Sequence, residues 1–128
     1  MATNYRTSLS RVRGLGSSHG GTDHFWHQRV TALANLVLLV FLIFTVIRLA
    51  GEPYPVMRAY FASPFVTVPA LMLAISACVH MRIGMQVIIE DYVHAEGPKM
   101  ALLLLNTFFA AAVALTCIAS LIKLSLGA

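Results

Sequence analysis

Residues 65–94 read FVTVPALMLAISACVHMRIGMQVIIEDYVH, and this stretch decides the fold of the chain. Its first fifteen residues, 65–79, contain no charged side chain and are typical of a membrane interior. The run then continues into His80 and Arg82, although ionisable residues are costly inside a bilayer and usually mark a functional position. This contrast predicts a transmembrane helix with a site built into it.

Three apolar runs, 30–50, 65–89 and 100–126, occupy most of the 128 residues. Crossing a hydrocarbon core of about 30 Å takes roughly 20 helical residues, so each run is long enough to span a membrane. Only 11% of the residues are charged, where soluble domains carry about 25%, which excludes a separate soluble domain. We expect an all-α membrane protein: a cytoplasmic N-terminal arm over residues 1–22, then a three-helix transmembrane anchor over 23–128 with spans at about 28–50, 65–90 and 99–126.

Basic residues set the expected orientation. With three spans, the N-terminal arm and the second loop share one side of the membrane, and the first loop and the C-terminus share the other. The first of these sides holds more basic residues, namely Arg6, Arg11, Arg13, Arg29 and Lys99 against Arg48, Arg58 and Lys123. By the positive-inside rule we expect the N-terminus in the cytoplasm.

His80 lies roughly 15 Å from Glu90, at the cytoplasmic end of the second span, and is therefore expected deep in the membrane. Ser76 and Gly84 lie one turn away on the same face, and a glycine there leaves room beside the imidazole for a flat macrocycle. A neutral imidazole is a good axial ligand for haem iron. The alternative is a histidine that only hydrogen-bonds across a helix interface. The chain offers one deeply buried histidine, so a haem with two histidine ligands would need the second from another subunit.

Sulfur-containing residues also lie within the predicted spans. Cys78 and Cys117 are not spaced as a metal site or a redox pair, and we interpret both as packing residues. Three methionines could in principle ligate iron but are interpreted as packing residues too: Met72, Met81 and Met85.

Asp91 follows His80 by eleven residues, which returns it to nearly the same helical face, and Tyr92 is beside it. A phenol at the membrane surface can donate a hydrogen bond to a carbonyl, and a neighbouring carboxylate can orient it or relay protons. These groups are suited to binding and protonating a quinone headgroup. On spacing alone, an interfacial tyrosine beside a solvated acid is the more common outcome, so both interpretations stay open.

Arg82 points about 200° around the helix from His80. It could snorkel to the cytoplasmic surface, pair with an acid, or meet an anionic group such as a haem propionate or a partner's carboxylate. Three further histidines lie near the cytoplasmic surface, where solvation is their usual state and assistance in proton uptake is an alternative: His24, His27 and His94.

These residues resemble the second-helix signature of the hydrophobic membrane anchor subunits of succinate dehydrogenase (complex II). That signature has a haem-ligating histidine, a glycine four residues later, and an Asp-Tyr pair eleven and twelve residues after the histidine, here His80, Gly84, Asp91 and Tyr92. The sequence DYVH is especially similar to the mitochondrial and alphaproteobacterial members. HFWHQRVTALANL, residues 24–36, resembles the Arg-x-Thr-Ala beginning of the family's first helix. The resemblance covers nearly the whole chain beyond residue 14.

The resemblance implies a membrane anchor and cytochrome b subunit of succinate:ubiquinone oxidoreductase, in a bacterial inner membrane, with its C-terminus in the periplasm. It implies that this subunit and a second anchor subunit hold one haem b in a shared helical bundle, on which the iron–sulfur and flavoprotein subunits dock. By position, His80 is the axial ligand of the haem iron and Gly84 lies beside the haem. Arg29 is a candidate propionate or interface arginine. Tyr92 would hydrogen-bond the carbonyl of ubiquinone, with Asp91 supporting it as the second catalytic residue of the quinone site.

Two alternatives from other classes stay open. One is a non-redox small membrane subunit of a transporter or proton channel. A proton relay would favour several ionisable residues at different depths on one face. The polar residues of the third span are instead Asn106, Thr107, Thr116 and Ser120, which counts against this alternative. The other is a structural anchor without haem. The chain has no flavin fingerprint or cysteine-rich iron–sulfur motif, so we expect succinate oxidation in another subunit and no independent activity of the isolated chain. The sequence does not fix the choice between ubiquinone and menaquinone, and no nucleic-acid partner is expected.

Overall fold

The computed structural model describes residues 7–14 and 22–127. A short helix, α1 (Ser8–Val12), falls within the predicted N-terminal arm, most of which lies outside the described residues. Four helices follow in the order α2 (Asp23–Leu49), α3 (Tyr54–Phe61), α4 (Pro64–Tyr92) and α5 (Glu96–Leu126). All the elements of the described residues are therefore α-helices.

The helices α2, α4 and α5 are each long and apolar enough to cross a membrane, with 27, 29 and 31 residues. At about 1.5 Å per residue they reach about 40 to 47 Å, which exceeds a hydrocarbon core of about 30 Å by several ångströms at each end. They extend beyond the predicted spans because their end turns carry the charged and aromatic residues. The prediction of an all-helical protein with three membrane-spanning segments is confirmed at the level of helix length and composition.

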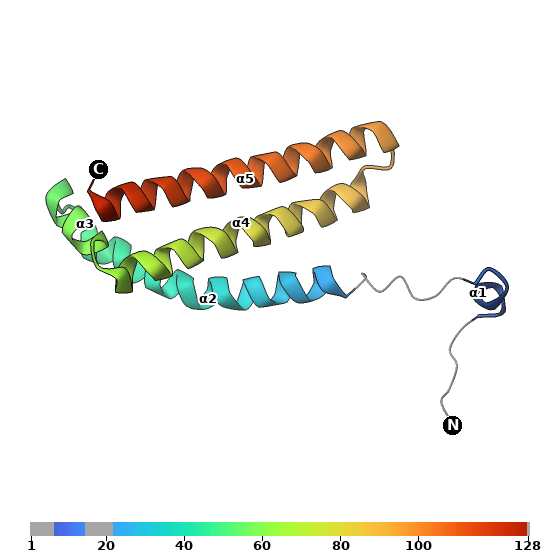
Figure 1. Ribbon diagram of the computed structural model, residues 1–128, viewed down its shortest axis with the longest axis horizontal. Helices are drawn as coiled ribbons and strands as arrows, with labels where there is room; N and C mark the ends of the chain where they lie inside the picture. Colours follow the sequence, from blue (N-terminus) through green and yellow to red (C-terminus); the bar gives the residue numbers. More distant parts are fainter. Residues whose placement is uncertain (1–6, 15–21, 128) are drawn as a thin grey trace, which may run out of the picture.

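The central helix of the bundle is α4. Figure 1 shows α2 along one side of it and α5 along the other, and both outer helices make extensive contacts with it. The short helix α3 lies across one end of the bundle, against α4 and α5 and close to the C-terminus. The beginning of α2 and the connection between α4 and α5 lie at the opposite end (Figure 1).

Local sequence signals set the limits of α4. Its first residue is Pro64, a position where proline's missing amide costs no hydrogen bond and its fixed φ suits the helix. The helix continues through Pro69, where a bend is tolerated close to its beginning. After Tyr92 the backbone of Val93 is extended, with φ −102° and ψ 106°, while its amide still donates to the carbonyl of Ile89 at 3.0 Å. The connection to α5 is only residues 93–95, which makes the two helices antiparallel neighbours.

The end of α5 is held by α3. Gly127 has a φ of +75°, in the left-handed region that glycine tolerates, and its amide donates to the carbonyl of Lys123. The guanidinium of Arg58 lies against Gly127 so closely that a Cβ there would overlap it. The last carbonyls of a helix carry partial negative charge, so Arg58 places a cation where it stabilises α5.

Polar side chains lie between the helices. Thr45, Thr67 and Asn106 are among the most buried residues of the described chain. The amide Nδ2 of Asn106 donates to the backbone carbonyl of Arg82 at 2.9 Å, which ties α5 to α4. The hydroxyl of Thr67 donates to the carbonyl of Phe61, which ties α4 to α3. Neighbouring helices therefore provide hydrogen bonds to polar groups that water would bind in a soluble protein.

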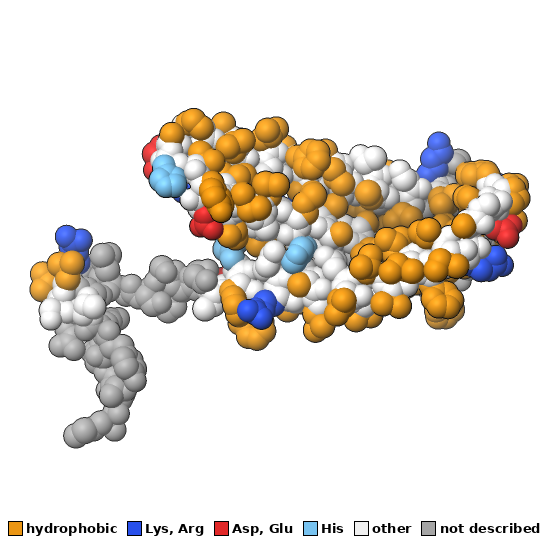
Figure 2. Space-filling view, turned by 180° about the vertical axis from the view of Figure 1, so that it is seen from behind, with side chains coloured by type: hydrophobic (Ala, Val, Ile, Leu, Met, Phe, Trp, Pro, Cys, Tyr) orange, Lys and Arg blue, Asp and Glu red, His pale blue; other side chains and the backbone are white. Residues whose placement is uncertain are grey.

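The outer surface of the long helices is mainly apolar. Figure 2 shows hydrophobic side chains over the middle of one face, with Lys, Arg, Asp and Glu gathered toward the two ends. Most large hydrophobic side chains of the long helices are exposed, including Leu33, Phe44 and Leu115. Lipid chains solvate such side chains, so association of the helices relies on packing and hydrogen bonds rather than on apolar burial.

We predict that Asn106→Leu weakens the contact between α4 and α5, because the carbonyl of Arg82 loses its donor from α5. The expected cost is roughly 1 kcal/mol, as for other hydrogen bonds between membrane helices. The measurement is the thermal unfolding of the complex in mild detergent. Thr116→Val is the matched control, since that hydroxyl donates within α5 to Ala112. Equal stability of the two variants would contradict the prediction.

Candidate functional site

His80 is half-buried on the side of α4 that faces α2. It lies twelve residues before the end of the helix at Tyr92, which is about 18 Å along the helix axis. Two residues of α2 contact its ring, Thr31 at Nδ1 and Gln28 at Nε2. The imidazole is therefore positioned by the contact between α2 and α4, inside a membrane-spanning segment.

The hydroxyl of Thr31 determines where the imidazole carries its proton. That hydroxyl donates to carbonyls of its own helix, with the carbonyl of His27 at 2.7 Å and that of Gln28 at 3.2 Å. The same oxygen lies 3.1 Å from Nδ1 of His80, and because its only proton is already used, it accepts a hydrogen bond there. We infer that Nδ1 carries the hydrogen of a neutral imidazole, which leaves a free lone pair on Nε2.

The neighbour of Nε2 is the side-chain amide of Gln28. Its Nε2 atom lies 3.5 Å from that of His80, a distance at the outer limit of a hydrogen bond, so the contact is weak. The amide oxygen Oε1 of Gln28 is buried and has no hydrogen-bond partner in the part of the chain that the structure describes. If another group approached Nε2 of His80, the side-chain amide of Gln28 would lose only this one weak contact.

Gly84 and Ser76 shape the same contact. A Cβ on Gly84 would lie 3.3 Å from Nε2 of Gln28, so the glycine makes room for that side chain. The hydroxyl of Ser76 donates to the backbone carbonyl of Thr31 at 3.3 Å. Both residues were expected on the face of His80, and they lie one turn to either side of it. The space beside Gly84, expected to be free for a macrocycle, is next to Gln28 in this chain.

Gln28 and Thr31 were not singled out in the sequence. With Asn35 they recur at intervals of three and four residues, which places them on one face of the apolar helix α2. The Oδ1 atom of Asn35 is also buried and lacks a hydrogen-bond partner within residues 7–14 and 22–127. This polar stripe was the signal that could have located the partner face of His80.

Arg29 lies next to this stripe but points elsewhere. It is exposed, and its guanidinium carbon is 4.6 Å from the centre of the Phe25 ring, a cation–π contact at the end of α2. Among the described residues no hydrogen bond or ion pair joins Arg29 to His80. The sequence motif Arg-x-Thr-Ala therefore contacts His80 through its threonine, and the role expected of Arg29 stays a prediction.

Asp91 and Tyr92 are the last two residues of α4, and both are exposed, with 80% of Tyr92 accessible. The preceding acid, Glu90, accepts a hydrogen bond from Gln86 at 2.8 Å. Asp91 and Tyr92 themselves have no hydrogen bond from their side chains and no ion pair in the described part of the chain. The carboxylate and the phenol are thus available to an external group at the end of the bundle, and the structure does not bring them into contact with His80.

Three further histidines of the described residues lie at this same end. Nδ1 of His27 is 2.8 Å from the carbonyl of Asp23 and donates to it, while His24 and His94 are exposed. No group of three or more His, Cys, Asp or Glu side chains that could hold a metal ion gathers within the described ranges 7–14 and 22–127. His80 is therefore not part of such a group within these ranges.

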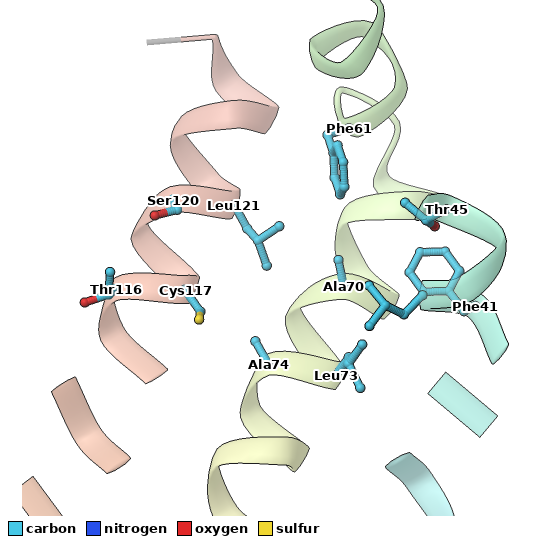
Figure 3. A pocket seen from close by; sticks show the side chains of 11 residues that line it. Phe41, Thr45, Phe61, Ala70, Leu73, Ala74, Thr116, Cys117, Ser120 and Leu121 are labelled. Atoms are coloured by element: carbon cyan, nitrogen blue, oxygen red, sulfur yellow. The ribbon is translucent and has the colours of Figure 1, made fainter. Parts of the chain in front are cut away.

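A separate hollow of about 360 Å³ lies between the three long helices at the α3 end. Figure 3 shows the ring of Phe61 extending into it from α3. The hydroxyls of Thr116 and Ser120 turn away from it, and that of Thr116 donates to the carbonyl of Ala112. The hollow is thus mainly apolar, and it contains neither His80 nor the exposed pair at the end of α4.

The sequence is similar to those of known membrane subunits. It is 32% identical over 124 residues to the succinate dehydrogenase hydrophobic membrane anchor subunit of Paracoccus denitrificans, covering 97% of this chain and 95% of that protein. The subunit of the same name from Rickettsia bellii is 24% identical over 109 residues, which is 85% of this chain and 87% of the relative. The succinate dehydrogenase membrane anchor subunit of Reclinomonas americana is 30% identical over 83 residues, or 62% and 69% of the two chains. Residues 3–121 match the family described as succinate dehydrogenase/fumarate reductase transmembrane subunit.

This chain belongs to that family. Membership confirms the resemblance seen in the second span and makes the chain a membrane anchor subunit of the succinate dehydrogenase complex. It therefore decides against the alternative of a transporter or proton-channel subunit. The three long helices and the short connections between them fit an anchor subunit that holds other subunits at a membrane.

Proposed function

We propose that this anchor subunit supplies Nε2 of His80 as an axial ligand to a haem b shared with a second anchor subunit, and that Tyr92 and Asp91 form part of a ubiquinone site. The observation that carries the haem proposal is the position of Thr31. Its hydroxyl donates within α2, and its oxygen lies 3.1 Å from Nδ1 of His80, where it is placed to accept the hydrogen of that nitrogen. A neutral imidazole held in this way would have its lone pair on Nε2, in the middle of a transmembrane helix.

The donor chemistry fits a haem iron. Histidines that ligate metals usually donate the hydrogen of their other ring nitrogen to a protein oxygen, which fixes the ring and increases its basicity. Thr31 provides that oxygen. When bound, haem b supplies a one-electron centre within the membrane. Because the described residues offer no set of several ligands at His80, we assign the opposite axial ligand to the second anchor subunit.

Gln28 is the residue that would have to move if a haem were held at His80. Its amide lies 3.5 Å from Nε2 of His80, where the iron would approach, and its buried oxygen has no partner within the described chain. The flexible side chain can turn aside with the loss of one weak contact. Gly84 then leaves its space beside the imidazole open, as the sequence pattern suggested.

The exposed end of α4 is suited to a quinone. The phenol of Tyr92 can donate a hydrogen bond to a quinone carbonyl, and the Asp91 carboxylate beside it can accept a proton or orient the phenol. Both groups are accessible at the end of the bundle and carry no side-chain hydrogen bond among the described residues. Protons from water reach this end directly, which the reduction of a quinone to a quinol requires.

The same end of the bundle is assigned to the cytoplasm, with the C-terminus in the periplasm of a bacterial inner membrane. The excess of basic residues on this side supports the orientation. The iron–sulfur and flavoprotein subunits would dock here, which brings electrons from succinate to the same surface as Tyr92. Arg29 is exposed at this end and is available to a propionate or to a partner subunit.

We predict that His80→Ala removes or alters the haem signal of the complex, because Nε2 is lost. The measurement is a dithionite-reduced minus oxidised visible spectrum of the complex purified through a tag on this chain. His94→Ala is the control, since this exposed histidine should leave the b-type α band unchanged. An unaltered spectrum in His80→Ala would refute the ligand assignment, and no band in the wild-type complex would indicate an anchor without haem.

A second variant tests the positioning role of Thr31. Thr31→Val should lower haem retention on the order of tenfold and raise the midpoint potential, because Nδ1 of His80 loses its acceptor and the imidazole donates less charge to iron. Haem content and a redox titration measure the two effects. Thr31→Ser should restore both values, and Thr45→Val, on the same helix but at its other end, should change neither. Wild-type haem content and potential in Thr31→Val would show that the hydroxyl has no such role.

We predict that Tyr92→Phe lowers ubiquinone reduction by about threefold to tenfold, the usual effect of losing one hydrogen bond. Succinate oxidation with an artificial acceptor should persist, because the soluble subunits are unaffected. The matched control is Tyr54→Phe, an exposed tyrosine at the opposite end of the bundle. Equal loss of both activities would indicate an assembly defect, and unchanged ubiquinone reduction would remove Tyr92 from the site.

A further inference from the structure

A groove of about 390 Å³ runs along one side of the contact between α4 and α5. Most of its lining residues on α5 are small, namely Ala110, Ala111 and Ala114, and Cys78 lies opposite them on α4. Small residues repeated at this spacing allow the backbone of another helix to come close. The groove on the other side of the same two helices is lined instead by large side chains, including Met85, Leu105 and Phe109.

The only charged residue that lines the small-residue groove is Arg82. It lies ten residues before the end of α4, and Thr107 lies eleven residues after the beginning of α5. Both are about 15 Å from the same end of the bundle, which is within the hydrocarbon core. Arg82 is therefore a cation in a part of the membrane where an unpaired charge is costly.

The side chain of Arg82 reaches toward α5. Its Nε donates to the hydroxyl of Thr107 at 3.4 Å, and that hydroxyl donates in turn to the carbonyl of Leu103 at 2.9 Å. Thr107 is at the same depth as Arg82, so this contact, which is long for a hydrogen bond, places Nε of Arg82 level with its own backbone. The remaining N–H groups of the guanidinium have no hydrogen bond to a residue of the described chain, and the side chain is exposed.

The chain itself does not provide an anion at this depth. Within the described residues Arg82 forms no ion pair. The sequence has five acidic residues, and all of them lie at or beyond the ends of the long helices: Asp23, Glu52, Glu90, Asp91 and Glu96. A second copy of this chain would therefore present no acidic side chain to the groove at this depth. Lipid phosphates lie outside the hydrocarbon core and are equally unsuited to this depth.

We propose that the groove between α4 and α5 seats a transmembrane helix of another subunit of the complex, and that this helix carries an aspartate or glutamate that pairs with Arg82. The small residues allow the close approach, and the guanidinium provides donors for a carboxylate at one defined depth. This surface lies on α4 about 200° from His80, so the proposal does not depend on haem ligation.

The first test is crosslinking in the whole complex within native membranes. A photoreactive benzoylphenylalanine replaces Ala111 in the groove, and the control carries it at Phe109, two residues away and at a similar depth in the groove on the other side. The expected product from position 111 is a covalent link to one transmembrane segment of another subunit with an acidic residue level with Arg82, absent from the control. A link only to lipid, to a second copy of this chain, or to a segment without an acidic residue would overturn the proposal.

The second test needs no bulky group in the groove. Arg82→Glu should reduce co-purification of the partner subunit in mild detergent by roughly tenfold, because two carboxylates would face each other. Replacing the partner's acidic residue by arginine should restore co-purification only in combination with Arg82→Glu. Arg82→Lys should retain most of the association and Arg82→Met should not. Full association in Arg82→Met and Arg82→Glu, or a loss that the reciprocal exchange does not restore, would show that Arg82 has no carboxylate partner.

Discussion

The structure depends on one constraint, that polar groups inside the hydrocarbon core must be satisfied by neighbouring helices because no water is present there. The central helix α4 meets this constraint on two sides. On one side His80 and Ser76 bond to Thr31 of α2, and on the other side the amide of Asn106 reaches the carbonyl of Arg82. Each contact needs a particular depth and rotation, so these contacts define how the helices are aligned. Contacts between apolar side chains alone would restrict the depth and rotation of the helices much less, because lipid chains are equally apolar.

This arrangement gives α4 two faces with different chemistry. His80 and Arg82 are two residues apart, which in a helix directs one toward α2 and the other toward α5. The imidazole and the guanidinium therefore contact different neighbouring helices. The proposed haem ligand, the proposed partner contact and the exposed pair Asp91 and Tyr92 then occupy three separate parts of one helix. A single span can in this way connect an electron carrier, a neighbouring subunit and a substrate.

The main features of the fold could be predicted from hydropathy, and the candidate residues from their chemistry. The presence of three helices that could span a membrane was predicted, because the transfer of apolar side chains into lipid depends on composition and length. The helix α3 lies in a segment that was expected from the sequence only as the first loop, and its role in covering the end of α5 through Arg58 was not foreseen. Gln28 and Thr31 were missed because their importance depends on which face of α2 meets α4. Gly84 was correctly placed on the face of His80, but its neighbour is a side chain of α2.

The sequence by itself determined that this chain is a three-span membrane protein with an imidazole and a guanidinium in its second span, and it contained the motifs of the anchor family. These properties follow from the free energy of placing each residue in lipid, which is a local quantity. The tertiary structure decided which residues of α2 contact the two ring nitrogens of His80, which residue fills the space beside Gly84, and that Nε of Arg82 contacts Thr107 of α5. These depend on hydrogen bonds between helices far apart in sequence, and only the packing of one helix on another sets the distances and rotations that such bonds require.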